Sequence, residues 1–151
     1  MIALLQRVSE ARVVCGAETV GAIGPGLCVL ACAERGDGPR QAARLAERIL
    51  AFRVFADAAG RMNRSVREAG GGVLLVPQFT LAADTRSGNR PSFTPAADPA
   101  TGQTLFEALV REVSALHAPV ATGRFGAHMR VALVNDGPVT FWLRVEPERA
   151  A

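Results

Sequence analysis

The chain has 151 residues and a formal net charge of +3, with 49% hydrophobic and 21% charged residues. This composition is that of a globular protein and excludes a disordered chain, and the length fits one domain better than two. We therefore predict a single domain over residues 1–151. The basic residues are dispersed, so the charge permits a polyanionic partner without requiring one.

The cysteines and the N-terminal run bear on where the protein works. Cys15, Cys28 and Cys32 are odd in number and contain no CxxC pair, and the last two lie in the apolar run LCVLACA. A free cysteine there acts as a small hydrophobic residue, so we expect a reducing, cytoplasmic location. The first apolar run ends at Arg7, too soon for a signal peptide or a membrane span, so we expect no membrane partner.

The first third of the chain predicts strands and then a helix. Residues 2–14 and 18–33 are rich in Val, Ile, Leu and Cys with interspersed glycines, which predicts three or four strands with turns at Cys15-Gly16 and at residues 24–26. The next segment has apolar residues at helical spacing and a proline, Pro39, suited to a first turn, so we predict a helix up to Phe52.

Residues 53–95 predict two further strands. RVFAD, residues 53–57, is expected to be a short strand, and residues 58–72 a loop with one helical turn. The run VLLVPQFTLAADT, residues 73–85, predicts a strand buried on both faces. Residues 88–95, GNRPSFTP, contain too many helix and strand breakers to be regular.

A second helix and two strands are predicted at the end of the chain. The helix begins at Asp98-Pro99, an N-cap residue followed by proline, and ends near Pro119. Residues 128–135 and 139–147 read as strands, and Asn135–Pro138 between them reads as a hairpin turn. The helical stripe is predicted to contain Leu105, Phe106, Leu109, Val110, Val113 and Leu116.

This element order predicts an α+β fold with two main helices and mixed sheets. Two helices cannot cover both faces of seven or eight strands. We therefore expect the strands to form two packed layers, with both helices on one outer side.

The usual catalytic signatures are absent from the sequence. It has no G-x-S-x-G elbow, no P-loop, no G-x-G-x-x-G after a strand and no metal-spaced His/Cys cluster, so we expect no metal and no cofactor. A structural role is favoured for His117 and His128. Two segments remain that packing does not explain: PQFT, with Pro77 inside an apolar run, and NDGPVT, with Gly-Pro before another run.

Together these two segments resemble the D-aminoacyl-tRNA deacylase family. The resemblance extends from Met1 to about Val145 and includes LLQRVSEA, GAIGPGLCVL, RMNRSV, QFTLAADTRSGNRPSF and TGRFGAHM. The family motifs SQxT and NxGPxT fall on Pro77–Thr80 and Asn135–Thr140.

The resemblance implies a three-layer β/β/α homodimer that hydrolyses the ester between a D-amino acid and the 3′ end of tRNA. It also implies that Gly137-Pro138 is cis and that each subunit presents it to the active site of its partner. Carbonyl oxygens of this Gly-cisPro backbone would then reject L-amino acids by collision, while mischarged glycyl-tRNA, which has no side chain to reject, would be accepted.

The same resemblance implies roles for individual residues. The backbone N–H groups of Phe79 and Thr80 would stabilise the oxyanion, and Gln78 would hold the substrate or the strand geometry. Thr80 would also contact the α-amino group or the attacking water. Arg7 is expected to hold the Gly-Pro loop, and the resemblance offers two pocket-wall candidates, Phe125 and Met129; a core or surface role stays open for these three.

One departure from the family pattern leaves alternatives open. The usual serine before Gln-Phe-Thr is Pro77 here, which also resembles animal deacylases that act on mischarged L-amino acids, for example L-Ala. The first alternative is therefore a deacylase with L-selectivity. The second is a non-catalytic module that binds the tRNA end, but such a surface should show clustered basic residues and exposed aromatic residues, and we expect neither here. No DNA partner is expected.

Overall fold

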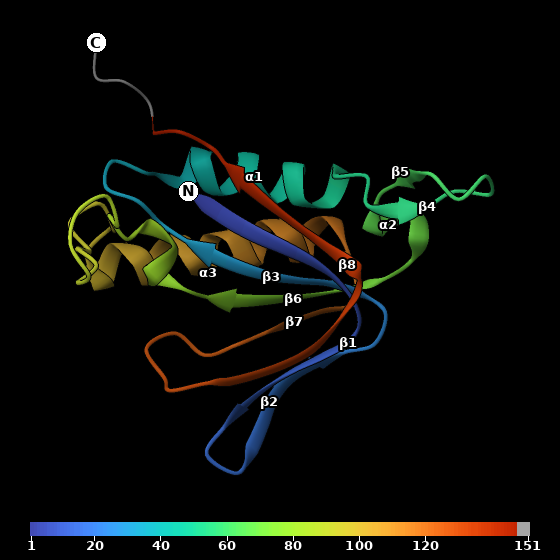
Figure 1. Cartoon of the computed structure of the whole chain (residues 1–151), viewed down its shortest axis with the longest axis horizontal. Coiled ribbons are helices and arrows are strands. Elements are labelled where there is room, and N and C mark those ends of the chain that lie inside the picture. Colours follow the sequence, from blue (N-terminus) through green and yellow to red (C-terminus); the bar gives the residue numbers. More distant parts are fainter. Residues whose placement is uncertain (148–151) are drawn as a thin grey trace.

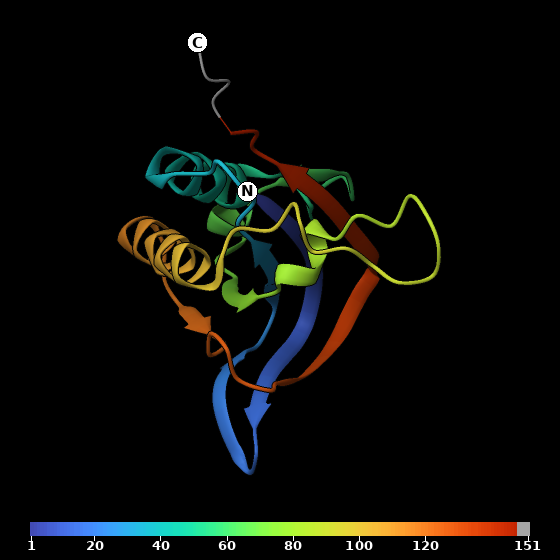
Figure 2. The ribbon, with the colours of Figure 1, turned by 90° about the vertical axis from the view of Figure 1, so that its left-hand side faces the viewer.

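The structure, a computed structural model, describes residues 1–147. A strongly bent six-stranded sheet carries both long helices on one side (Figures 1 and 2). The elements in chain order are β1 (Ile2–Cys15), β2 (Glu18–Ile23), β3 (Gly26–Cys32), α1 (Pro39–Ala51), β4 (Phe55–Ala56), β5 (Met62–Arg64), α2 (Val66–Ala69), β6 (Gly72–Pro77), the 3₁₀ helix η1 (Phe79–Ala82), α3 (Pro99–Leu116), β7 (Val120–Thr122) and β8 (Arg130–Arg144).

Strand β1 organises the sheet. It pairs in antiparallel fashion with β2, β3 and β8, and β3, β6 and β7 then follow in parallel, giving the order β2-β1-β3-β6-β7 with β8 on the other edge of β1. β4 and β5 form a separate two-stranded sheet. Both parallel pairs and antiparallel pairs occur in the main sheet, so the predicted mixed α+β class is confirmed.

Two apolar clusters account for the layers. Alternate residues of β6 point to opposite faces, so that Leu75 packs towards the helices while Leu74 packs into a second cluster with Val8 and Val13 of β1. The second cluster lies between the two parts of the bent sheet, whereas the first lies between the sheet and α1 and α3. The strands therefore form two packed layers with the helices outside one of them, as predicted.

Both long helices begin at the predicted residues. Pro39 is the first residue of α1, and the Gly38 N–H before it donates to Gln41 Oε1 at 2.9 Å. Asp98 caps α3, its carboxylate accepting the Thr101 N–H at 3.0 Å. Of the predicted apolar stripe, Leu105, Phe106, Leu109 and Val113 are buried and Val110 is half-buried, whereas Leu116, the last residue of the helix, is 45% exposed.

The predicted hairpin at Asn135–Pro138 is wrong. β8 is one continuous strand that pairs with β1 from Arg130 to Arg144, and the segment NDGP forms an irregularity opposite residues 6–10 of β1. The Asn135 side chain bridges this irregularity, because its Oδ1 accepts the Val139 N–H at 2.8 Å and its Nδ2 donates to Thr140 Oγ1 at 2.9 Å. Turn-forming residues here accommodate extra length within a strand.

Two predicted strands are shorter than expected, and two short strands were not predicted. The strand expected over residues 73–85 ends at Pro77 and is followed by η1, so Gln78 and Thr80 do not lie on a strand face. The strand expected at residues 53–57 is reduced to β4. The short strands β5 and β7 were not predicted, since three residues are too few for a pattern.

Candidate active site

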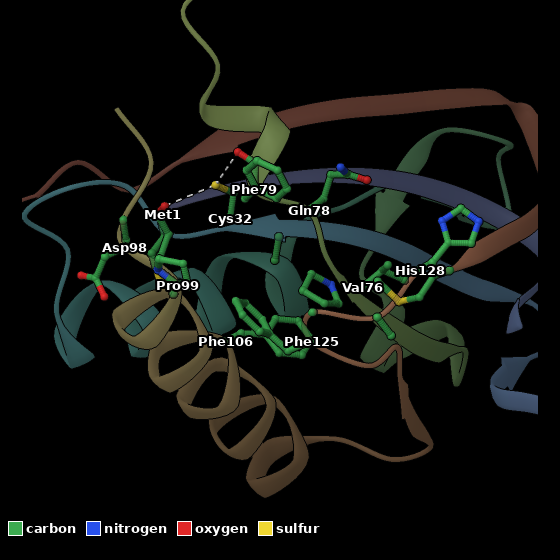
Figure 3. Close-up of a pocket in the computed structure, with 18 of the residues that line it drawn as sticks. Met1, Cys32, Val76, Gln78, Phe79, Asp98, Pro99, Phe106, Phe125 and His128 are labelled. Atoms are coloured by element: carbon green, nitrogen blue, oxygen red, sulfur yellow. Dashed lines mark hydrogen bonds between the residues drawn. The ribbon is translucent and has the colours of Figure 1, made fainter. Parts of the chain in front are cut away.

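A cavity of about 470 Å³ opens where β6 ends, beside the start of α3 and the segment before β8 (Figure 3). Most of its wall is apolar. It is lined by Met1, Ala31, Cys32, Ala33, Val76, Pro77, Gln78, Phe79, Ala97, Asp98, Pro99, Gly102, Phe106, Phe125, Gly126, Ala127, His128, Met129 and Val131.

The structure brings five of the predicted site residues to this cavity. Pro77, Gln78 and Phe79 come from the end of β6, and Phe125 and Met129 come from the connection between β7 and β8. The Gln78 N–H donates to the Ala31 carbonyl at 2.8 Å, which fixes the point where the chain leaves the sheet and turns into η1.

The start of η1, at the rim of the cavity, has two backbone donors without a hydrogen-bond acceptor in residues 1–147. The first N–H groups of a helix have no partner inside it, and the N–H groups of Phe79 and Thr80 donate no hydrogen bond within residues 1–147. The Gln78 side chain donates to Thr80 Oγ1 at 2.5 Å. Thr80 itself is exposed and does not line the cavity. Its link to the site is the hydrogen bond from Gln78, which does line the cavity.

The opposite wall is aromatic. Figure 3 shows Phe106 and Phe125 across the cavity from Gln78 and Phe79. The two rings lie 6.4 Å apart between centroids, and Met129 Sδ accepts the Arg124 N–H at 3.3 Å. Phe106 was predicted only as part of a helical stripe. Nothing in the sequence distinguishes Phe106, as a residue of the cavity wall, from the other apolar residues of the helix.

Ionisable side chains are few in the cavity wall. His128 and Asp98 are exposed, and the Asp98 carboxylate is engaged as the cap of α3. The Cys32 thiol donates to the carbonyl oxygens of Ala33, at 3.3 Å, and Phe79, at 3.4 Å. Burial raises the pKa of Cys32 to about 11, so the thiol is protonated at neutral pH and is a poor nucleophile.

We expect Cys28 and Cys32 to resist alkylation in the folded protein. Burial raises the pKa of Cys28 to about 11 as well, and both side chains are buried, whereas Cys15 is partly exposed. Iodoacetamide at mildly alkaline pH followed by peptide mass spectrometry should find the label on Cys15 first. Denatured protein, the control, should be labelled at all three positions; rapid native labelling of Cys32 would contradict this view of the cavity.

The remaining predicted residues gather at a second place. Arg7 on β1 donates from Nε to the Asp136 carbonyl at 2.9 Å and from Nη1 to the Val54 carbonyl at 2.6 Å. It thereby holds the segment that contains Gly137 and Pro138, which are joined by a cis peptide bond and are both exposed. Neither residue lines the cavity of its own chain.

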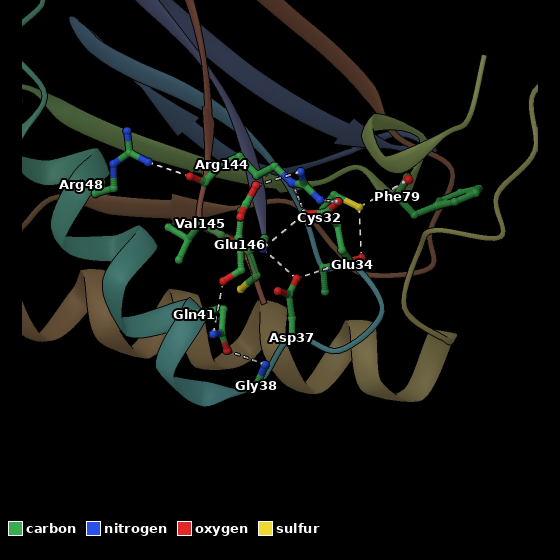
Figure 4. A network of polar contacts seen from close by, with 12 residues as sticks. Cys32, Glu34, Asp37, Gly38, Gln41, Arg48, Phe79, Arg144, Val145 and Glu146 are labelled. Carbon is green, nitrogen blue, oxygen red and sulfur yellow. Dashed lines mark hydrogen bonds and ion pairs between the residues drawn. The ribbon is translucent and has the colours of Figure 1, made fainter. Parts of the chain in front are cut away.

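A polar network behind the cavity was not foreseen (Figure 4). The Met1 ammonium donates to the Val145 carbonyl at 2.6 Å and lies 2.7 Å from Asp37 Oδ2. Arg144 donates to both carboxylate oxygens of Glu34, at 2.9 and 2.8 Å, and Glu34 raises the pKa of Arg144. The network joins the start of β1 to the end of β8 and so holds the Met1 side chain in the cavity wall.

The expectation that aromatic residues would not be exposed is wrong. Phe79 is 58% and Phe93 42% exposed, with their ring centroids 5.1 Å apart, and Trp142 on β8 is 55% exposed. Trp142 is exposed because it lies on the outer face of β8, whereas Phe79 lies in η1 and Phe93 in the irregular segment of residues 88–95. Within residues 1–147, no helix has the length and apolar character needed to cross a bilayer, and His, Cys, Asp and Glu side chains form no group that could hold a metal ion.

Comparison with known proteins gives concordant matches. The family model described as D-Tyr-tRNA(Tyr) deacylase matches residues 4–144. A D-aminoacyl-tRNA deacylase of Thioalkalivibrio sulfidiphilus (strain HL-EbGR7) is 66% identical, covering 99% of this chain and 100% of the relative. One of the same name from Herminiimonas arsenicoxydans is 64% identical, covering 97% of this chain and 99% of the relative.

Two solved structures are also similar. One described as c-Myc DNA Unwinding Element Binding Protein has a TM-score of 0.92 and 34% identity, covering 97% of this chain and 99% of that one. A second, described as a probable eukaryotic D-amino acid tRNA deacylase, has a TM-score of 0.78 over 94% of this chain and 97% of that one; at 17% identity it shares the fold alone.

Proposed function

This chain belongs to the D-Tyr-tRNA(Tyr) deacylase family and is a hydrolase of D-aminoacyl-tRNA, and we propose that its cavity binds the aminoacylated terminal adenosine of the tRNA. The observation that carries the proposal is the pair of unengaged backbone N–H groups at Phe79 and Thr80, beside an apolar cavity of about 470 Å³. That volume is in the range of sites for one small organic molecule.

In the proposed reaction, the protein positions an ester that is already activated. The N–H groups of Phe79 and Thr80 bind the oxyanion that develops when water attacks the carbonyl carbon, and the neighbouring 2′-hydroxyl of the ribose assists that attack. Gln78 orients the Thr80 hydroxyl, which receives the α-amino group or the water. Phe125 and Met129 form the apolar wall against the adenosine. The chemistry uses no thiol, in accord with the raised pKa of Cys32.

Selection of the D-enantiomer is proposed to require a second copy of the chain. Gly137 and Pro138 are exposed and held by Arg7, but they lie outside the cavity of their own chain. A homodimer that packs on the outer face of β8, where Val134 and Trp142 are 51% and 55% exposed, would present their carbonyl oxygens to the partner's cavity. An L-side chain would then collide with backbone, whereas a D-side chain or glycine would not.

Two alternative functions remain, and Pro77 bears on the first of them. Proline in place of serine removes a hydroxyl and an N–H from the cavity rim, so selectivity for an L-amino acid such as alanine is the first alternative. A non-catalytic tRNA-end binding module is the second, and the exposed Phe79 and Phe93 favour contact with RNA bases. The DNA-related name of one similar structure describes that protein. We place this chain in the cytoplasm with its tRNA substrate.

One experiment separates these functions. Purified protein is offered D-Tyr-tRNA, Gly-tRNA and L-Ala-tRNA, and ester hydrolysis is followed at equal enzyme concentration. Hydrolysis of the D-tyrosyl and glycyl esters, with the L-alanyl ester resistant, is expected. Turnover of the L-ester alone would support the L-selective alternative, and turnover of none would leave the binding module.

Replacing Gly137 by alanine should reduce the discrimination between D- and L-esters. Gly137 has φ of +143°, and a β-carbon there would lie 2.6 Å from Val139 Cγ2 and 3.2 Å from Arg7 Nη2, so the segment must shift. We expect the ratio of kcat/KM for D-Tyr-tRNA to that for L-Tyr-tRNA to fall about tenfold or more, as a shift near 1 Å suffices for such losses. Gly16→Ala at a distant turn is the control, and an unchanged ratio would contradict the proposed role.

A further inference from the structure

A second hollow lies against the aromatic wall of the cavity. Its volume is about 510 Å³, it is open to solvent, and it shares Phe106 and Phe125 with the cavity. The other residues that line it are Gln103, Glu107, Val110, Arg111, Thr122, Gly123 and Arg124, from α3 on one side and from β7 and the connection after it on the other. We call this hollow the α3–β7 groove.

In the proposed binding mode, the nucleotides before the terminal adenosine leave the cavity towards the α3–β7 groove. The scissile ester must lie at Phe79, and Figure 3 shows Phe106 and Phe125 on the opposite side of the cavity. A cavity of about 470 Å³ has room for roughly one nucleoside with its amino acid. The nucleotides that precede the terminal adenosine must therefore leave the cavity, and a route past Phe125 takes them into the groove.

The groove has the chemistry that a sugar-phosphate backbone requires. Arg111 on α3 and Arg124 after β7 are both exposed and line the groove from its two sides. Its one carboxylate, Glu107, already accepts a hydrogen bond from Gln103 Nε2 at 3.0 Å. Arg124 is paired with Glu18 on β2 at 3.3 Å, and such exposed pairs are weak enough for a phosphate to replace them. Thr122 adds a hydroxyl.

We propose that the α3–β7 groove binds the sugar-phosphate backbone of the single-stranded 3′ end of tRNA, with Arg111 and Arg124 contacting the phosphates next to the terminal adenosine. This inference rests on the proposed function and extends it from the ester to the RNA chain. Phosphate contacts fix register and affinity and carry no base preference, so the groove would serve tRNAs of any sequence in the paired stem.

The test compares two substrates of one reaction. D-Tyr-tRNA carries the backbone that would occupy the groove, whereas the D-tyrosyl ester of adenosine carries only the part inside the cavity. Both are assayed with wild-type protein, with Arg111→Gln, with Arg124→Gln and with the double variant. Arg44→Gln is the matched control, because Arg44 is an exposed arginine on the other helix and is paired with Glu47 at 2.7 Å. Circular dichroism checks that all variants are folded.

We expect the double variant to raise KM for D-Tyr-tRNA about tenfold, as the loss of two exposed charged contacts implies. The slope of log(kcat/KM) against log salt should become shallower by about 1.4, roughly 0.7 for each lost phosphate contact of a single strand. Hydrolysis of the adenosine ester should stay at the wild-type rate, and Arg44→Gln should change neither substrate.

Two outcomes would overturn the inference, and they are distinguishable. If wild-type protein hydrolyses both substrates and the double variant has unchanged KM and salt dependence for D-Tyr-tRNA, or loses equally on both substrates, the groove does not bind the backbone and the proposed function stands. If wild-type protein hydrolyses neither substrate, the proposed function fails and the inference fails with it.

Discussion

Replacing Phe79 by proline should lower kcat for D-Tyr-tRNA about 10²–10³-fold, the loss found when one oxyanion donor is removed from an enzyme. Proline has no backbone N–H, so this substitution deletes one of the two proposed donors itself. The Phe79 N–H makes no hydrogen bond within residues 1–147, so its loss breaks no bond of the folded chain.

We expect the backbone around position 79 to tolerate the change. Residue 79 is the first of η1, and a proline is suited to the first position of a helix. Gln78 before it has φ of −148° and ψ of 81°, outside the helical region that a following proline disfavours. We therefore expect a folded protein, with wild-type circular dichroism and an unfolding midpoint close to that of the wild type.

A second substitution at the same position separates the N–H from the ring. Phe79→Ala keeps the N–H and removes the exposed side chain, so it should retain most of kcat while Phe79→Pro loses it. Single-turnover hydrolysis at saturating enzyme measures the chemical step for both. If the two variants lose activity equally, the phenyl ring is what matters and the proposed role of the backbone is wrong.

Replacing Gly26 by alanine should have the largest effect on stability, a loss of more than about 4 kcal/mol, which places it among the most disruptive single substitutions. A β-carbon at Gly26 would lie 1.9 Å from the Gly72 carbonyl oxygen and 2.7 Å from its carbonyl carbon. Gly26 pairs with Gly72 where the parallel strands β3 and β6 begin, and the obstacle is backbone, which cannot rotate away. Urea unfolding followed by circular dichroism measures the loss.

Gly24→Ala is the control for that experiment. It lies two residues away, in the connection between β2 and β3, and a β-carbon there meets nothing within 4 Å. We expect its free energy of unfolding to stay within about 0.5 kcal/mol of wild type, as for most surface substitutions. Equal destabilisation by the two alanines would show that the connection, and not the contact of Gly26 with Gly72, is the sensitive feature.

The sequence predicted those elements whose signals are local. Pro39 and the Asp98-Pro99 pair mark helix starts by their own conformational preferences, and the apolar run before Pro77 indicates a strand buried on both faces. The hairpin predicted at Asn135–Pro138 was wrong because it, too, was based on a local signal. Their local preference is for a turn, but pairing with the long strand β1 extends β8 through them, and no local rule contains that partner.

The candidate site was predictable only where its residues are unusual. Pro77 interrupts an apolar run and so distinguishes the segment Pro77–Thr80, and the family resemblance supplied Arg7, Phe125 and Met129. Their roles in the reaction stay predictions. The remaining wall is built of residues such as Ala31 and Ala97, which have no distinctive chemistry and become lining only through the fold. The exposed rings of Phe79 and Phe93 likewise depend on a loop that no periodicity describes.

The pairing of β1 with β8 has a consequence for the order of synthesis. Among the strands of residues 1–147, β1 is translated first, yet its partner along one whole edge, β8 (Arg130–Arg144), is translated last. At about 5–20 residues per second, that edge stays uncovered for several seconds or more in each nascent chain. Unpaired strand edges are where chains associate wrongly. We therefore expect this edge of β1 to be open to wrong association until β8 has been made.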